Sequence, residues 1–220
     1  MEILDRITEE GEVDTNLDNQ VVSSNEICKE VLGQDYDYIE NPKKVLAQIG
    51  LDHAQVSKKY GIPMFLDADN EFRKWAKSLR EFANQNEVEI VFLSEEDLHS
   101  QSMAAGYDPE NSKIGIPSID LDNCSEKEAL LWGSNLSHEL VHHMQKKQDS
   151  NMPIEKAEYE AYVVSDLFTA MYHARNMVPE EGYLRDFETV SYIFDQIEAS
   201  SRGYYQKVGK GSDQISWMKE

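Results

Sequence analysis

Apolar residues recur along most of the chain at steps of three and four, the spacing that places them on one face of a helix. The clearest example is Phe72, Trp75, Leu79 and Phe82, which predicts a helix over about 69–83 with a buried aromatic face. Other segments with this spacing, or with helix-start and helix-end signals, are also expected to be helical. They cover about 24–33, 42–50, 52–60, 125–148, 154–176 and 183–199.

Two short segments have the composition of β-strands instead. Residues Val88–Leu93 are β-branched and aromatic, and Lys113–Pro117 form a second strand after a turn-forming sequence at 107–112. Many helices with a few strands predict an α+β fold. We expect the small sheet to contain a third strand that the pattern does not locate.

Length and charge distribution suggest the domain organisation. At 220 residues the chain fits one domain with a single core. Residues 1–22 contain seven acidic side chains and little to bury, which predicts a mobile acidic arm. One domain is expected over 23–202, followed by a weakly ordered tail over 203–220.

Composition limits the partners and the compartment. The formal net charge of -21 would repel nucleic acid, so no nucleic-acid partner is expected, whereas a basic protein partner fits. No apolar run approaches the ~18 residues of a membrane-spanning helix, and the first residues lack the pattern of a signal peptide. Together with two widely separated cysteines, Cys28 and Cys124, these features predict a cytoplasmic protein, or one exported without a cleaved signal. Oligomeric state has no signal in the sequence.

The expected 125–148 helix carries an arrangement of residues that suggests chemistry. His138 and His142 lie four residues apart, so both imidazoles face the same side of the helix. Glu139 lies about 100° around the helix, close enough to contact a metal-bound water without being a ligand. This is the HExxH pattern of zinc metallopeptidases, in which the histidines bind Zn²⁺ and the glutamate is the general base. His143 projects about 100° from His142 and is expected at the surface or behind the ligands.

A catalytic zinc site usually has a third protein ligand. The short turn at 149–153 requires the helices on either side of it to form an antiparallel hairpin. At 1.5 Å per residue, His142 lies about 9 Å before the turn and Glu158 about 7.5 Å after its start, which places the two level with each other. Glu158 and Glu160 flank the apolar stripe of the second helix on opposite sides. This geometry does not separate them as the third ligand.

The HExxH helix, with Glu158 and Ala161 on the next helix, resembles the gluzincin class of zinc peptidases, especially the small cytoplasmic ones of the ImmA/IrrE kind. In that class the third ligand is the glutamate of an E-x-x-A arrangement, which Glu158 matches through Ala161. Glu160 does not match, because Val163 follows it. The resemblance covers Ser125–Phe168. It implies a minimal zincin fold, in which a small sheet accompanies an active-site helix and a helical C-terminal subdomain, and a zinc-dependent endopeptidase acting on protein or peptide substrates.

The resemblance also implies supporting residues. Many relatives carry Asp or Asn four residues after the ligand glutamate, hydrogen-bonded to a ligand histidine. Tyr162 occupies that position, so either its hydroxyl or Asp166, one turn later, is expected to take this role. A group that stabilises the tetrahedral oxyanion is expected from His173, Tyr172 or Tyr183.

The strand before the active-site helix has an expected role in substrate binding. In zincins an edge strand pairs with the extended backbone of the substrate, and Lys113–Ile116 occupies the matching place in the chain. The resemblance therefore implies that Ile114, Gly115 and Ile116 pair with the substrate.

Two other functions are compatible with the sequence. One is a zincin-fold protein that binds zinc or a basic partner without cleaving it, and the other is a toxin- or effector-type protease with one host target. The intact Glu139 favours catalysis, because a non-catalytic descendant has no chemical reason to keep a general base.

Overall fold

The computed structural model describes residues 24–33, 38–68, 71–94, 105–148, 151–177 and 182–209, without the side chains at 24, 25, 177, 183 and 201–209. These residues form a mixed α+β structure, which confirms the predicted fold class. The predicted arm at 1–22 lies outside the described residues. The helices are α1 (Ser24–Leu32), α2 (Pro42–Tyr60), α3 (Phe72–Gln85), α5 (Glu126–Gln148), α6 (Ile154–Met177) and α7 (Gly182–Gly209), with a 3-10 turn, η2 (Phe65–Ala68), and the strands are β1 (Glu89–Leu93), β2 (Gly106–Asp108) and β3 (Lys113–Pro117).

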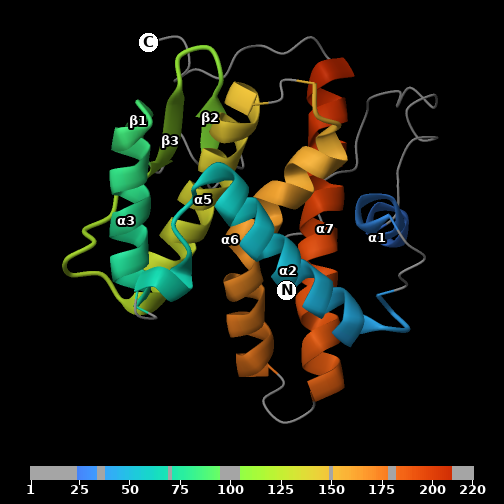
Figure 1. Ribbon diagram of the computed structural model, residues 1–220. Helices are drawn as coiled ribbons and strands as arrows, with labels where there is room; N and C mark the ends of the chain where they lie inside the picture. The colour runs from blue at the N-terminus through green and yellow to red at the C-terminus, as the bar shows by residue number, and fades with distance from the viewer. Residues whose placement is uncertain are drawn as a thin grey trace, which may run out of the picture.

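The sheet and α3 lie on one side of the molecule, and α6 and α7 lie on the other (Figure 1). Helix α5 runs between them and contacts both α6 and the strands β2 and β3. Helix α2 crosses in front of α6 and α7 in this view and packs on both. None of the described helices is both long enough and apolar enough to span a membrane.

Strand β3 is the central strand of the sheet, whose order is β1-β3-β2. Ile114 lies opposite Ile90 of β1, in parallel, and opposite Tyr107 of β2, antiparallel. Gly115 is likewise paired on both sides. The prediction that Ile114, Gly115 and Ile116 form an edge strand is therefore wrong. Their backbone groups hold the sheet together, and all three residues are buried.

Strand β2 is the third strand that the sequence pattern does not locate. It covers only Gly106–Asp108 and overlaps the predicted turn, which in fact begins after Asp108. The buried carboxylate of Asp108 accepts hydrogen bonds from the backbone N–H of Glu110 at 2.9 Å and from Nδ2 of Asn111 at 2.7 Å. These bonds fold β2 back onto β3, because an Asp side chain can cap a turn formed by the residues that follow it.

Helix α5 starts where the sequence predicts. Ser125 and Glu128 form a capping box, in which Glu128 N–H donates to Ser125 Oγ at 3.2 Å and Ser125 N–H donates to Glu128 Oε2 at 2.7 Å. This start sets the register of the helix, and with it the direction in which its histidines point.

Helices α2 and α7 are longer than the sequence pattern predicts. Helix α2 continues through Gly50, where a break is predicted, because one continuous buried face outweighs the roughly 1 kcal/mol helix penalty of glycine. It ends at Gly61, whose φ of 69° lies in the left-handed region that glycine adopts without strain. Helix α7 extends to Gly209 instead of ending near 199, and the rest of the predicted tail lies outside the described residues. The buried face of α2 consists of Val45, Ile49, His53, Val56 and Tyr60.

Helix α5 packs against α3 at a glycine. The indole of Trp75 on α3 is buried, and its Nε1 donates to the Pro63 carbonyl at 2.8 Å, which fixes the orientation of the ring. A Cβ placed at Gly133 would lie 2.8 Å and 2.9 Å from two atoms of this ring. The two helices can approach this closely because position 133 carries no side chain.

We expect Gly133→Ala to lower the free energy of unfolding by about 1–3 kcal/mol, because the indole can move only if α3 shifts. This loss exceeds the roughly 1 kcal/mol by which alanine favours a helix over glycine. Gly50→Ala is the matched control, since a Cβ there would meet no atom within 4 Å. It should stabilise the protein by about 0.5–1 kcal/mol. Urea denaturation measures both variants, and stabilisation by both would contradict the tight contact.

His53 is buried between α2 and α6. Its Nδ1 lies 2.7 Å from the carbonyl oxygen of Val163, so Nδ1 carries the proton of the neutral ring. The ring meets Phe168 edge-on, with centroids 5.2 Å apart. Burial lowers the pKa of His53, and the bond to Val163 offsets only part of this effect.

The contribution of His53 to the stability of the protein should therefore fall in mild acid. In the unfolded chain a histidine titrates near pH 6.5, so the contribution of neutral His53 is complete above about pH 6.5 and is lost as the pH falls below it. Between pH 7.5 and 5.5 this loss is at most about 1.4 kcal/mol. His53→Asn keeps a donor for Val163 but does not titrate. Urea denaturation should therefore show the variant gaining stability relative to the parent, by up to about 1 kcal/mol, as the pH falls over this range. An unchanged pH dependence would contradict the assignment.

Candidate metal centre

The two histidines of the HExxH pattern lie on the same face of α5, as predicted. The rings of His138 and His142 meet edge to face with centroids 4.7 Å apart, and their Nε2 atoms are 3.0 Å apart. Both side chains are largely buried. Two nitrogen donors therefore point to one location beside the helix.

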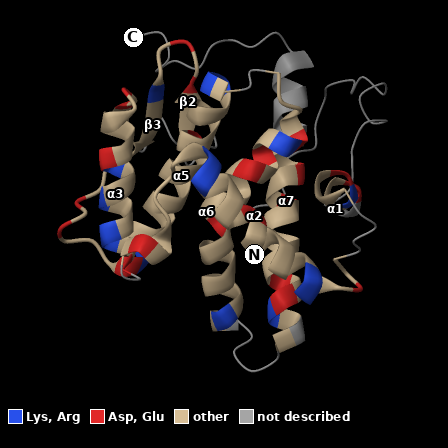
Figure 2. Cartoon of the chain, in the orientation of Figure 1, with Lys and Arg blue, Asp and Glu red and all other residues tan. Residues whose placement is uncertain are grey.

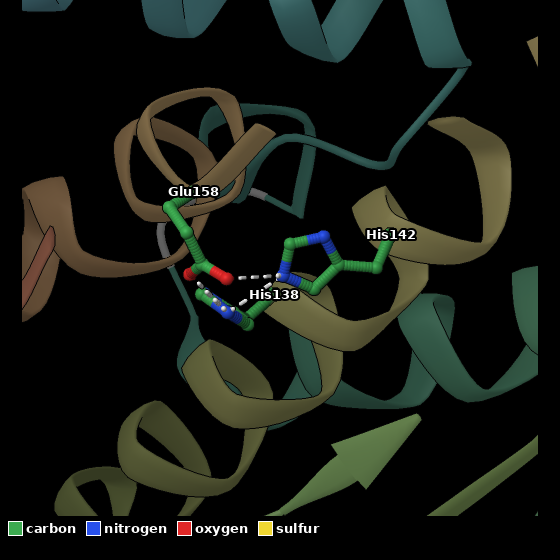
Figure 3. Close-up of side chains that lie close together, drawn as sticks. All are labelled: His138, His142 and Glu158. Atoms are coloured by element: carbon green, nitrogen blue, oxygen red, sulfur yellow. Dashed lines mark hydrogen bonds and ion pairs between the residues drawn. The ribbon is translucent and has the colours of Figure 1, made fainter. Parts of the chain in front are cut away.

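Glu158 of α6 supplies a third donor at this location (Figure 3). Its Oε2 lies 3.5 Å from His138 Nε2, and its Oε1 lies 3.7 Å from His142 Nε2. Among the described residues, these three are the histidine, cysteine or carboxylate side chains that lie close enough together to hold a metal ion. The structure thus brings together His138, His142 and Glu158, the three residues predicted as ligands.

The spacing and chemistry of these donors fit a zinc ion. Ligand atoms about 2.0–2.1 Å from a tetrahedral zinc lie roughly 3.3 Å from each other. The two Nε2 atoms are 3.0 Å apart, and each lies 3.5 or 3.7 Å from one of the two Glu158 oxygens, all close to this value. Glu158 Oε2 is buried and accepts no hydrogen bond from the described residues, although a buried carboxylate oxygen normally has a partner. Two imidazoles and a carboxylate are a ligand set that zinc uses in catalytic sites.

Glu160, the alternative third ligand, points elsewhere. Its buried carboxylate is 2.9 Å from Nζ of Lys59, and it accepts hydrogen bonds from the hydroxyl of Tyr60 and from Nε2 of Gln145. Because these three donors occupy both carboxylate oxygens, the structure separates the two glutamates that helix geometry could not. Glu160 is not part of the donor cluster.

The charges around the cluster shift the pKa values of its members. Burial lowers the pKa of His138, but the carboxylates of Glu158 and Glu139 outweigh this effect and raise the pKa to about 9. Burial raises the pKa of Glu158, but the neighbouring imidazoles outweigh it and the pKa is lowered. The cluster therefore keeps the Glu158 carboxylate ionised beside a protonated His138, and a bound cation would replace that proton.

Glu139 lies beside the cluster without joining it. Burial raises its pKa, and the charges of His138 and His142 offset only part of that effect. The backbone N–H of Tyr107 in strand β2 lies close enough to the Glu139 carboxylate to lower its pKa. This strand, which the sequence pattern misses, thus passes directly next to the candidate general base.

His143 connects the same strand to α5. Its Nδ1 lies 2.9 Å from the hydroxyl of Tyr107, and the two rings meet edge to face. Since His143 is buried, a surface position for it is wrong. It lies outside the donor cluster and supports the contact between the helix and the sheet.

The structure places both predicted supporting residues near His138. The ring of Tyr162 lies with its centroid 4.5 Å from that of His138, but its hydroxyl is 2.5 Å from Oγ of Ser200, so it is not directed at a ligand histidine. Burial raises the pKa of Asp166 to about 6, partly offset by the charge of His138. Of the two, Asp166 is the group whose charge acts on His138.

Two of the three predicted oxyanion-stabilising residues are not brought to the cluster. Tyr172 and His173 follow Glu158 by about 21–22 Å of helix axis on α6, so their predicted role is wrong. His173 lies instead near Tyr192 of α7, with ring centroids 6.5 Å apart. Tyr183 stands in the first turn of α7, and its side chain is outside the described residues.

Comparisons of the chain with protein-family models, with curated proteins and with solved structures find no match. What the candidate centre can do must therefore be argued from its own residues.

We expect zinc to stabilise the folded protein through this cluster. At about 100 times its dissociation constant, a ligand of the folded state adds about 2.7 kcal/mol to the free energy of unfolding, or roughly 5–10 °C in Tm for a chain of this size. Glu158→Gln should lose most of this shift, whereas Glu188→Gln, at an exposed position on α7, should keep it. Differential scanning fluorimetry with zinc and then with a chelator measures the shift. Equal shifts in the parent and in Glu158→Gln would contradict the ligand set.

Proposed function

We propose that the protein is a zinc-dependent endopeptidase with a minimal zincin-type arrangement of sheet and active-site helix. The observation that carries the proposal is the convergence of His138, His142 and Glu158, with the half-buried Glu139 beside them and outside the donor set. Zinc peptidases separate the same two tasks, because the ligands hold the ion and a further glutamate moves the proton.

His138, His142 and Glu158 would hold the ion. Zinc bound there would supply Lewis-acid chemistry, which polarises the scissile carbonyl and makes water acidic near neutral pH. Other groups of the protein would transfer the protons and bind the substrate backbone.

Glu139 would act as general base and then as general acid. It takes a proton from the attacking water and delivers it to the nitrogen of the leaving amine. Burial raises its pKa, which makes the carboxylate a stronger base than an exposed glutamate. The nearby backbone N–H of Tyr107 would help to hold the carboxylate in position.

Strand β2 would bind the substrate backbone, in place of the central strand β3. It pairs with β3 on one side, and no other described strand pairs with it. Because β2 also contacts Glu139 through Tyr107, a peptide that adds to its outer edge would pass next to the general base.

The net charge supports a basic substrate by electrostatic steering. Figure 2 shows that acidic and basic residues are interspersed along the helices that the structure describes. The preference would therefore come from the overall charge of the chain rather than from one acidic patch on that face.

Glu139→Gln tests the proposal. Since Glu139 is outside the donor set, the variant should bind zinc as the parent does, while its cleavage of an unfolded basic protein should fall by about 10²–10⁴-fold. Zinc content is measured by mass spectrometry after purification without added metal, and cleavage by gel electrophoresis and mass spectrometry of the products. Glu188→Gln serves as the control and should match the parent in both measurements.

The other results are equally informative. If the parent binds zinc but cleaves neither a basic nor an acidic unfolded protein, the peptidase proposal fails and a zinc- or partner-binding role replaces it. If the parent binds no zinc, the whole proposal fails. If Glu139→Gln cleaves as fast as the parent, the assignment of the general base is wrong.

A further inference from the structure

The second ring nitrogen of His142 has a defined partner. In Figure 3 this nitrogen lies on the side of the ring that faces away from Glu158. It is Nδ1, and it lies 2.9 Å from Oε1 of Gln145, one turn further along α5. Gln145 is 4% exposed, so its amide must find all its partners within the protein.

The orientation of the Gln145 amide follows from those partners. Its nitrogen lies 2.9 Å from the carbonyl oxygen of Ala157 and 3.2 Å from Oε2 of Glu160. Both of these atoms can only accept a hydrogen bond, so the amide group must present its two N–H donors to them. A flipped amide would place its oxygen against a carbonyl and a carboxylate. The oxygen of Gln145 therefore faces His142.

This orientation determines the tautomer of His142. An amide oxygen only accepts hydrogen bonds, so the proton in the bond between His142 and Gln145 belongs to Nδ1. A neutral imidazole with its proton on Nδ1 has its lone pair on Nε2. Nε2 is the atom that points to Glu158 and His138, and only a nitrogen with a free lone pair can bind a metal.

Glu160 holds Gln145 from the other side. Its carboxylate is anchored by Nζ of Lys59 at 2.9 Å and by the hydroxyl of Tyr60, both on α2. Tyr60 is buried, whereas Lys59 is partly exposed. A chain of hydrogen bonds thus runs from α2 through α6 to the imidazole on α5.

We propose that Gln145 is a positioning residue, which fixes the tautomer of His142 and directs its Nε2 into the metal centre, and that Glu160 acts through Gln145. The inference rests on the proposed zinc site. Hydrogen-bond partners of metal-binding histidines commonly contribute 10–100-fold to metal affinity.

Two substitutions of Gln145 separate positioning from simple packing. Gln145→Leu removes the acceptor for His142 and both donors. Gln145→Glu also removes the donors to Ala157 and Glu160, but it keeps an acceptor for His142. If the acceptor is what matters, Gln145→Leu should bind zinc about 10–100-fold more weakly than the parent, and Gln145→Glu should retain clearly more affinity than Gln145→Leu.

Zinc affinity is measured by competition with a chromophoric chelator, using Zn²⁺ alone as the ligand. Gln148→Leu is the matched control, because it makes the same change at an exposed position one turn further along the helix and should leave the affinity unchanged. Urea denaturation without metal reports whether each variant is folded.

A second measurement needs neither zinc nor activity. The ring nitrogens of His142 are observed by NMR in the metal-free protein, at an alkaline pH at which the neutral imidazole predominates. The parent, Gln148→Leu and Gln145→Glu should all show the proton on Nδ1. Gln145→Leu should show a mixture of tautomers, because no acceptor then selects one.

Glu160→Gln tests the part of the hydrogen-bond chain that lies beyond Gln145. Alone it should weaken zinc binding, because the amide no longer anchors the donors of Gln145 as a carboxylate does. Added to Gln145→Leu it should cause no further loss, because Glu160 acts only through Gln145. Additive losses would overturn this part of the inference.

The remaining outcomes separate the inference from the proposed function. If the parent binds zinc and Gln145→Leu binds it equally well, or if both Gln145 variants lose affinity equally, the positioning role is overturned while the zinc site stands. If the parent binds no zinc, the proposed function fails. In that case the NMR experiment alone decides whether Gln145 selects the tautomer.

Discussion

Helices α5 and α6 are held in register by buried polar contacts as well as by apolar packing. On one side of the histidine pair, Ser134 Oγ donates to the Ser165 carbonyl at 2.8 Å. On the other side, Nε2 of Gln145 donates to the carbonyl of Ala157 at 2.9 Å. A slip of one residue between the helices would break both bonds and would move Glu158 by about 1.5 Å along the axis and 100° around it. These two hydrogen bonds therefore keep Glu158 level with the histidines and hold the donor cluster together.

Two glutamates on α6 show how neighbours decide the role of a buried charge. Glu158 and Glu160 are separated by about 200° around the helix, and both are largely buried. Glu160 meets the ammonium group of Lys59, so its charge is compensated within the protein. Among the described residues, Glu158 forms ion pairs with two imidazoles, which compensate its charge as long as they hold a proton. A divalent cation could compensate the negative charge of Glu158, whereas the charge of Glu160 is already compensated by Lys59.

Local spacing allowed much of the structure to be predicted, and contacts distant in sequence account for what was missed. Helix periodicity is sufficient to place His138 and His142 on one face. The break predicted at Gly50 is absent because packing against other helices stabilises α2, and no local pattern reports that packing. Strand β2, with three residues, is too short to show an alternating pattern. The choice between two glutamates depended on Lys59, which is 101 residues away from Glu160 in the chain.

The same sequence separations bear on the order in which the centre can assemble during folding. The three donors lie within about 20 residues of one another, on two helices joined by a short turn, so the entropy lost in bringing them together is small. The bond between Lys59 and Glu160 closes a loop about five times longer, and it forms only when α2 docks on α6. A folding intermediate with α5 and α6 paired would therefore already contain the three donors and the bond from Gln145 to Ala157, while the anchoring of Glu160 by Lys59 would follow only when α2 docks.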